Sequence, residues 1–140
     1  MRVVIDTNIF LGACLGNGAA NRAVSACLRG QASPLMGNAL FNEYEDVLHR
    51  SALFKRSRLN VDERSALLDI FLARCEWIHI YYSWRPNLPD EADNHLVELA
   101  VAGNAQMIVT RNVRNVARME LSFPRLRVSM PEDFLLELTR

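Results

Sequence analysis

The stretch Arg2-Val-Val-Ile-Asp6-Thr-Asn8 decides the fold class, because a short apolar run leads directly into three polar residues. Consecutive apolar residues predict a strand that is buried on both faces, as in parallel sheets covered by helices. We expect this strand over residues 2–6, followed by a helix from Ile9 to about Arg29 with a break near residues 16–18. The opening of the chain therefore predicts a strand–helix unit of an α/β protein.

Strands and helices are expected to alternate along the rest of the chain. Strands are predicted at Pro34–Gly37, Trp77–Tyr82, Gln106–Thr110 and Arg125–Met130, and helices at Asn38–Arg50, Val61–Arg74, Glu91–Gly103 and from Pro131 onward. Asn38 is expected to cap its helix, Gly103 to end the helix before it, and Pro131 to occupy a first helical position. This order predicts an α/β fold with three α/β/α layers around a central, mainly parallel sheet.

Length and composition exclude several classes of protein. With 140 residues, half of them hydrophobic and 23% charged, the chain predicts one globular domain over residues 1–140. No apolar run is long enough to span a membrane, and no signal-peptide pattern opens the chain, so a cytoplasmic protein is expected. Cys14, Cys27 and Cys75 lie far apart in apolar patterns, which predicts buried free thiols rather than a zinc or redox site.

Asp93 is the most informative acidic residue. In its predicted helix it shares one stripe with Leu96, Val97 and Ala100, so a carboxylate lies on the side that faces the core. A charge on an apolar stripe is costly unless something compensates it, and a bound cation would do so. A capping box with Asp90 as the N-cap is the alternative, which explains Asp90 better than Asp93.

Three further places bring polar residues toward one edge of the predicted sheet. Asp6 ends the first strand, although it could simply cap the following helix. Asn112 follows the strand that ends at Thr110, where a plain turn is the alternative. Glu43 and Glu45 flank the apolar face of their helix at similar angles, and periodicity does not choose between them.

Several oxygen ligands at one sheet edge predict a hard divalent cation. Ligands in open parallel sheets bind at the carboxyl ends of the strands. Carboxylates crowded there would raise each other's pKa unless a cation intervened. Oxygen ligands select Mg²⁺ or Mn²⁺, and no cluster of Cys and His indicates zinc.

The motifs along the chain resemble those of the PIN-domain family, in particular its VapC-like toxins. The resemblance covers nearly the whole length and lies in four segments in the same order. They are Val-Val-Ile-Asp6-Thr-Asn-Ile-Phe, Asn42-Glu43-Tyr-Glu-Asp-Val-Leu-His-Arg, Pro89-Asp90-Glu-Ala-Asp93-Asn-His-Leu and Ile108-Val-Thr110-Arg-Asn112-Val-Arg-Asn115. The resemblance selects Glu43 over Glu45.

The resemblance implies a Mg²⁺- or Mn²⁺-dependent ribonuclease that hydrolyses single-stranded RNA, as the toxin of a toxin–antitoxin pair. The implied catalytic residues are Asp6, Glu43, Asp93 and Asn112, with Asp6 and Asp93 as metal ligands and Asp90, Thr7, Thr110 and Asn115 as accessory residues. Arg111, Arg114 and Arg118 would track the RNA backbone, with a solvated helix face as an equal alternative. The family also suggests a homodimer and a small antitoxin that blocks the site.

One departure from the family pattern keeps a second interpretation open. The closing motif usually carries an acid where this chain has Asn115. An amide adds no negative charge, so the site has one acid fewer for a second ion. The alternative is a catalytically degenerate PIN fold that binds RNA or a protein without cutting. Receiver domains, Asp-x-Asp phosphatases and nucleotide-binding folds are disfavoured because their motifs are missing.

Overall fold

Five short parallel strands form the centre of the protein. The computed structural model describes residues 1–16, 18–80, 91–116, 123 and 125–139, without the side chains of residues 91–93 and 115. The strands are β1 (Arg2–Ile5), β2 (Ser33–Met36), β3 (Glu76–Trp77), β4 (Met107–Val109) and β5 (Arg127–Ser129), in the order β3-β2-β1-β4-β5. Each pairing among them is parallel.

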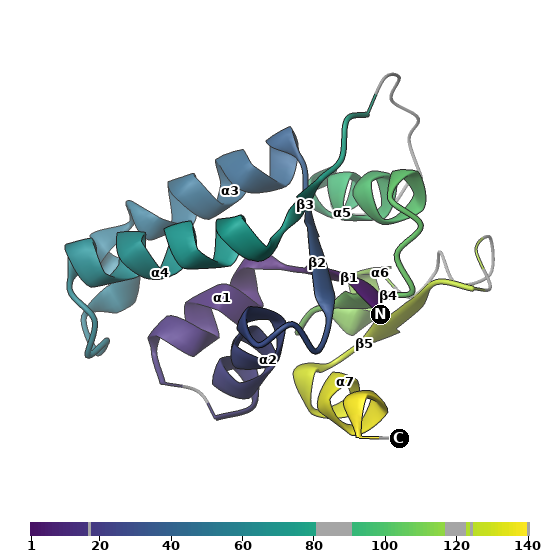
Figure 1. Cartoon of the computed structure of the whole chain (residues 1–140). Coiled ribbons are helices and arrows are strands. Elements are labelled where there is room, and N and C mark those ends of the chain that lie inside the picture. Colours follow the sequence, from purple (N-terminus) through teal and green to yellow (C-terminus); the bar gives the residue numbers. More distant parts are fainter. Residues whose placement is uncertain (17, 81–90, 117–122, 124, 140) are drawn as a thin grey trace.

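Helices cover the sheet on both sides, which confirms the three-layer expectation. They are α1 (Thr7–Cys14), α2 (Gly18–Leu28), α3 (Asn38–Leu48), α4 (Val61–Arg74), α5 (Glu91–Ala102), α6 (Val113–Val116) and α7 (Pro131–Leu138), with a 3₁₀ turn, η1 (Ser51–Phe54). Helices α1 and α2 lie on one side of the strands and α5 lies on the other (Figure 1). Helix α2 packs against α1, α4 and α7, whereas α5 contacts β1, β2 and β4.

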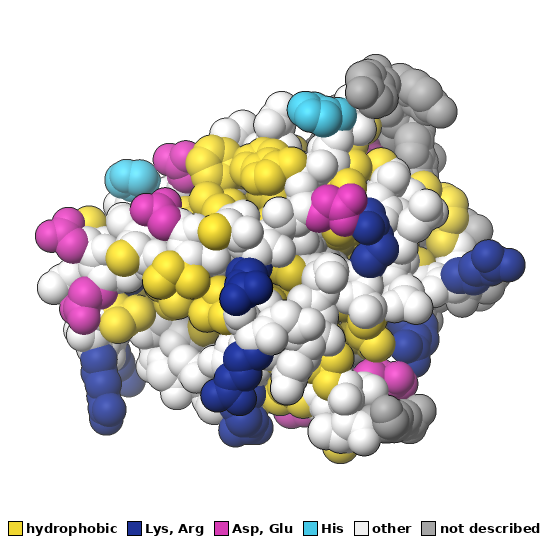
Figure 2. Space-filling model, in the orientation of Figure 1, with side chains coloured by type: hydrophobic (Ala, Val, Ile, Leu, Met, Phe, Trp, Pro, Cys, Tyr) yellow, Lys and Arg dark blue, Asp and Glu magenta, His cyan; other side chains and the backbone are white. Residues whose placement is uncertain are grey.

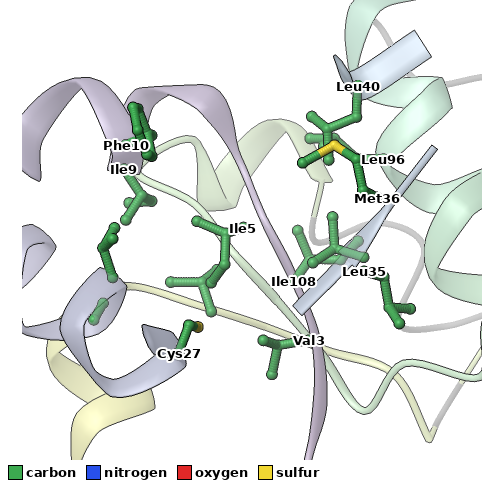
Figure 3. Packing of buried hydrophobic residues seen from close by; sticks show 14 of the residues in the cluster. Val3, Ile5, Ile9, Phe10, Cys27, Leu35, Met36, Leu40, Leu96 and Ile108 are labelled. Atoms are coloured by element: carbon green, nitrogen blue, oxygen red, sulfur yellow. The ribbon is translucent and has the colours of Figure 1, made fainter. Parts of the chain in front are cut away.

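The first strand is buried on both faces, as its apolar run predicts. Val3, Val4 and Ile5 are essentially inaccessible to solvent. Figure 3 shows Phe10 of α1 on one side of the strands and Leu96 of α5 on the other. Apolar side chains of the strands therefore hold both helical layers, and burial of this area is the main stabilising contribution.

The strand order places a topological switch at the centre of the sheet. The chain moves outward from β1 through β2 to β3 on one side, and β4 and β5 are added on the other side of β1. In open parallel sheets, ligands bind outside the carboxyl ends of the strands where the order reverses. Residues that follow β1 and β4 therefore lie at the expected binding position.

The N-cap expected for α3 was wrong, whereas α5 ends directly before Gly103 as expected, although Gly103 is not its left-handed residue. Gly37, not Asn38, is at the N-cap of α3, and Asn38 is the first helical residue. Helix α5 ends in a Schellman turn, in which Ala105 N donates to Ala100 O and Asn104 takes the left-handed conformation with φ 53°. Gly103 instead permits close packing, because a Cβ there would lie 2.5 Å from Leu35 Cδ1.

Other elements differ from the sequence expectation in extent. The strand expected over Trp77–Tyr82 is β3, which ends at Trp77; residues 81 and 82 lie outside the described residues. The short helix α6 directly after β4 was not predicted. Helix α4 begins and ends as predicted, and a capping box between Asn60 and Glu63 starts it.

The three cysteines are free, and two of them are buried as expected. Cys75 is only partly buried, which corrects the expectation for that residue. Burial raises the pKa of the Cys14 thiol to about 11 and those of Cys27 and Cys75 to about 12. All three are therefore protonated and unreactive at neutral pH.

Candidate functional site

The site is built around Asp6, the residue that follows β1. The Asp6 backbone N–H donates to Val109 O at 3.0 Å, which ties the end of β1 to the end of β4. Asp6 stands at the N-cap position of α1, but its side chain makes no capping hydrogen bond. The carboxylate instead faces polar side chains at the switch point, so capping does not account for this acid.

Asp6 is only 4% exposed, and two side chains donate to its carboxylate while a third lies close to it. Thr110 Oγ1 donates to Asp6 Oδ2 at 2.7 Å from the far side of the switch, and Asn8 Nδ2 donates to the same oxygen at 3.2 Å. Thr7 Oγ1 lies 3.3 Å from Asp6 Oδ1. These contacts hold the carboxylate in one orientation at the carboxyl ends of β1 and β4.

The Asp6 carboxylate carries a charge that its surroundings only partly stabilise. Burial raises the pKa of Asp6 above its ordinary value, and the hydrogen bond from Thr110 lowers it again in part. The nearby negative charge of Glu43 raises it further. A carboxylate in this position gains from a cation beside it.

Glu43 is placed at the site by its neighbour in sequence, Tyr44. The Tyr44 ring is fully buried and packs edge-on against Phe10, with ring centroids 5.3 Å apart. Its hydroxyl donates to the Ile5 carbonyl at 2.6 Å, one residue before Asp6. This contact sets the rotation of α3, so that Glu43 faces the site while Glu45 is exposed.

The Glu43 carboxylate has a donor on each oxygen. Thr7 Oγ1 donates to Oε1 at 2.5 Å, and His95 Nε2 lies 2.7 Å from Oε2. Burial alone would raise the pKa of Glu43, but the hydrogen bonds from His95 and Thr7 outweigh it and leave that pKa below its ordinary value. The Thr7 hydroxyl also lies close to Asp6. It therefore stands between the carboxylates of two acids that are 37 positions apart in sequence.

The segment after β4 forms the opposite wall of the site. The Asn112 backbone N–H donates to Thr110 Oγ1 at 3.0 Å, while the residue itself is exposed. The Arg111 guanidinium is bound to Glu132 of α7 at 2.7 and 2.9 Å. Arg114 on α6 is exposed. Of the two described arginines expected to contact RNA, Arg111 therefore already has an acidic partner.

The family model of the PIN domain matches residues 2–114. The match includes β1, α3, α5 and β4, the elements that carry the site described above.

The chain belongs to the PIN-domain family.

A solved structure supports the fold of this PIN domain. The chain is similar to one in the crystal structure of VapBC2 from Rickettsia felis bound to a DNA fragment from their promoter. The TM-score is 0.57 at 19% sequence identity, and the similarity covers 91% of this chain and 97% of the other. The comparison with curated proteins found no relative of similar sequence.

Four predicted site residues lie outside the part of the PIN domain that the structure describes. They are Asp90, Arg118 and the side chains of Asp93 and Asn115. The backbone of Asp93 lies in the first turn of α5, and the apolar residues of its stripe, Leu96, Val97 and Ala100, are buried. Because His95 of the same turn contacts Glu43, the N-terminal end of α5 lies at the site.

The oxygen atoms that this PIN domain offers as metal ligands, among its described side chains, fit a hard cation. Asp6 and Glu43 supply carboxylate oxygens, and Thr7 and Thr110 supply hydroxyl oxygens, which suit Mg²⁺ or Mn²⁺ better than softer metals. Among the described side chains, no three His, Cys, Asp or Glu residues form a metal-binding group. The expected third acid, Asp93, is not among those side chains.

Asn8, Tyr44 and His95 are site residues that sequence reasoning missed or assigned elsewhere. Asn8 follows Asp6 by two positions, and its place beside the acid at the strand end was a usable signal. Tyr44 reads as an apolar residue of the α3 stripe, which hides its hydroxyl. The sequence pattern favours a surface position for His95 but also allows it to reach the site, and in the structure its side chain is only 18% exposed and contacts Glu43.

Scattered basic side chains and one cavity are further features of the described surface. On the face drawn in Figure 2, which carries α3 and α4, basic side chains are scattered and do not form a continuous track. A cavity of about 370 Å³ lies at the C-terminal end of α5, lined by Ala100, Val101, Asn104, Ala105, Phe123, Arg125 and Leu126. It is at the other end of α5 from Glu43 and Asp6. In the described part of the chain, no helix has the length and apolar character needed to cross a membrane.

Proposed function

We propose that this PIN domain is a ribonuclease that depends on Mg²⁺ or Mn²⁺ and hydrolyses phosphodiester bonds of single-stranded RNA. The observation that carries the proposal is the pairing of Asp6 and Glu43 through Thr7 at the switch point of the sheet. The N-terminal turn of α5, which bears Asp93, lies at the same place. Two acids that are held close together at the carboxyl end of a strand repel each other, and a shared cation would relieve that repulsion.

Asp6 and Asp93 would hold the metal ion. The raised pKa of Asp6 reflects burial and the charge of Glu43, so the pair has excess negative charge that a divalent cation neutralises. When bound, the ion supplies electrostatic stabilisation of the charge that develops on the scissile phosphate. Asn8 and Thr110 keep the Asp6 carboxylate in place while it binds.

Glu43 would orient or deprotonate the attacking water. Its pKa is held below the ordinary value, so it is ionised at neutral pH and accepts a proton rather than supplying one. The water oxygen would attack phosphorus and give one proton to Glu43 as the bond from phosphorus to the ribose oxygen breaks, and the leaving oxygen would take up a proton from a water molecule. No serine or cysteine nucleophile is needed in this reaction. Asn112 and Asn115 would help to position waters or phosphate oxygens, with Asp90 as an accessory acid.

Arg114 and Arg118 would contact the RNA backbone beside the site. Arg114 is exposed on α6, the short helix that follows β4. The Arg111 guanidinium would bind an RNA phosphate only after releasing the Glu132 carboxylate. Both partners are oxygen anions, so one can replace the other. Binding through phosphate contacts weakens steeply as the salt concentration rises, which gives this part of the proposal a direct test.

We further propose that the protein is the toxin of a toxin–antitoxin pair, that it forms a homodimer and that it acts in the cytoplasm. Its fold matches a chain in a VapBC2 complex over nearly the whole length of both chains. A cognate antitoxin would bind close to the acids and block RNA. Co-expression with the neighbouring reading frames, followed by affinity purification and light scattering, tests both the partner and the oligomeric state.

RNA cleavage by the purified protein tests the proposed activity. Cleavage of single-stranded RNA should require Mg²⁺ or Mn²⁺, stop with EDTA and be lost in Asp6→Ala. Asp69→Ala is the matched control, because Asp69 is an exposed acid on α4 away from the site. Cleavage that survives both EDTA and Asp6→Ala would refute the proposal.

Calorimetry separates the enzyme from a degenerate fold that only binds RNA or protein. An enzyme of this kind should bind Mn²⁺ in the wild type and lose that binding in Asp6→Ala. A protein that binds RNA tightly but shows no carboxylate-dependent Mn²⁺ site would be the binding module instead.

A further inference from the structure

His95 and Glu43 form a contact that the proposed reaction does not yet explain. The imidazole comes from α5 and the carboxylate from α3, and their atoms Nε2 and Oε2 are 2.7 Å apart. Both side chains are largely shielded, with 18% and 29% of their surfaces exposed. A contact of this length between half-buried polar groups restricts both side chains to one arrangement.

The chemistry of the carboxylate determines which atom donates. An ionised Glu43 is an acceptor only, so the proton of the bond must be on His95 Nε2. The other ring nitrogen, Nδ1, is buried and has no hydrogen-bond partner among the described residues. Among the described residues, the hydrogen bond to Glu43 is therefore the one that orients the imidazole.

The contact links the three helices of the site, because side chains of α1 and α5 both donate to Glu43 of α3. Thr7 at the start of α1 holds Oε1 of Glu43, and His95 near the start of α5 holds Oε2. A glutamate side chain has three rotatable bonds and samples several rotamers when it is free. With both oxygens held from opposite elements, the carboxylate keeps one orientation toward Asp6.

We propose that His95 is a positioning residue, which orients the Glu43 carboxylate for the hydrolysis of RNA. This inference rests on the proposed function, and it adds to it a residue that touches neither RNA nor metal. Each carboxylate oxygen has a second lone pair, which would accept a hydrogen bond from the attacking water. Loss of the His95 donor releases Oε2, so Glu43 spends less time in the orientation that the reaction needs.

Three variants separate positioning from a merely structural role. His95→Ala removes the donor, whereas His95→Gln retains a neutral N–H donor on a side chain of similar reach. His49→Ala is the matched control, because His49 is an exposed histidine at the C-cap of α3 whose Nδ1 lies 2.6 Å from the Glu45 carbonyl. RNA cleavage is measured for each protein as kcat and KM, together with its thermal unfolding temperature.

We expect kcat to fall in His95→Ala and to recover in the conservative variant His95→Gln. His95→Ala should lower kcat by about 10- to 100-fold with little change in KM, the range found when groups that orient site residues are removed. His95→Gln should recover most of that loss, and His49→Ala should cleave as the wild type does. In a Glu43→Gln background, His95→Ala should have no further effect, because the group that it orients has changed.

Two results would overturn the inference. One is an unchanged kcat in His95→Ala while the wild type cleaves RNA. The other is an equal loss in His95→Ala and His95→Gln that follows their unfolding temperatures, which would make the contact purely structural.

A measurement on the metal-free protein keeps this inference distinct from the proposed function. The ¹⁵N chemical shift of His95 Nε2 reports the hydrogen bond to Glu43, and it should change in Glu43→Gln. If the wild type cleaves no RNA, the proposed function fails, and the shift alone decides whether His95 orients Glu43. A His95 Nε2 shift that is the same in both proteins would refute the orienting contact.

Discussion

Replacing Thr110 by valine tests the hydrogen bond on which the orientation of Asp6 depends. Thr110 is fully buried, and its hydroxyl donates to Asp6 Oδ2 at 2.7 Å. Valine has the same shape without the donor, so the substitution leaves one oxygen of a buried carboxylate without that partner. A hydrogen bond to a charged group contributes about 1.5–3 kcal/mol, so we expect the free energy of unfolding to fall by about 2 kcal/mol at neutral pH. For a chain of this size, the unfolding temperature should fall by roughly 6 °C.

The effect of Thr110→Val should depend on pH. Burial raises the pKa of Asp6 and the Thr110 bond lowers it, so the bond favours the ionised carboxylate. The stability difference between wild type and variant is therefore complete well above the folded-state pKa of Asp6. It should shrink as the pH falls through that pKa, because the protonated carboxyl gains less from the donor.

Urea denaturation in metal-free buffer, followed by circular dichroism, measures this difference at several pH values. Thr139→Val is the matched control, since Thr139 Oγ1 donates to Leu136 O at 2.8 Å on an exposed helix end. It should change stability by less than about 0.5 kcal/mol at any pH. A Thr110→Val variant that loses no more than Thr139→Val, or whose loss does not vary with pH, would refute the reasoning.

Three more substitutions test the site and its supports. Asp6→Asn should stabilise the metal-free protein at neutral pH. Burial raises the pKa of Asp6, so the ionised carboxylate lowers the stability of the folded wild type as the pH rises through that pKa. A variant that is less stable than the wild type in urea denaturation with EDTA would contradict this. Tyr44→Phe should lower the free energy of unfolding by about 1–2 kcal/mol, since it leaves the buried carbonyl of β1 without its donor, and an unchanged urea midpoint would count against that bond. Gly103→Ala should destabilise by about 1–3 kcal/mol, because the new Cβ would lie 2.5 Å from Leu35 Cδ1, and differential scanning calorimetry showing no loss would place that contact in doubt.

The sequence by itself determined the fold class and the position of Asp6. Runs such as Val3-Val-Ile5 specify burial on both faces, and burial on both faces requires helices on each side of a parallel sheet. The boundaries of α4 were also predicted, because local periodicity and end residues are sufficient for an amphipathic surface helix. These features depend on neighbours within a few residues, which is why a single sequence reveals them.

Only the tertiary structure decided how the acids are arranged. Periodicity left Glu43 and Glu45 equal, and the rotation of α3 that separates them comes from the Tyr44 hydroxyl on the Ile5 carbonyl. In the same way, His95 reads as a surface residue until α5 packs beside α3 and brings it to Glu43. Partners so far apart in sequence are chosen by the packing of whole elements, and no local pattern in the chain carries that information.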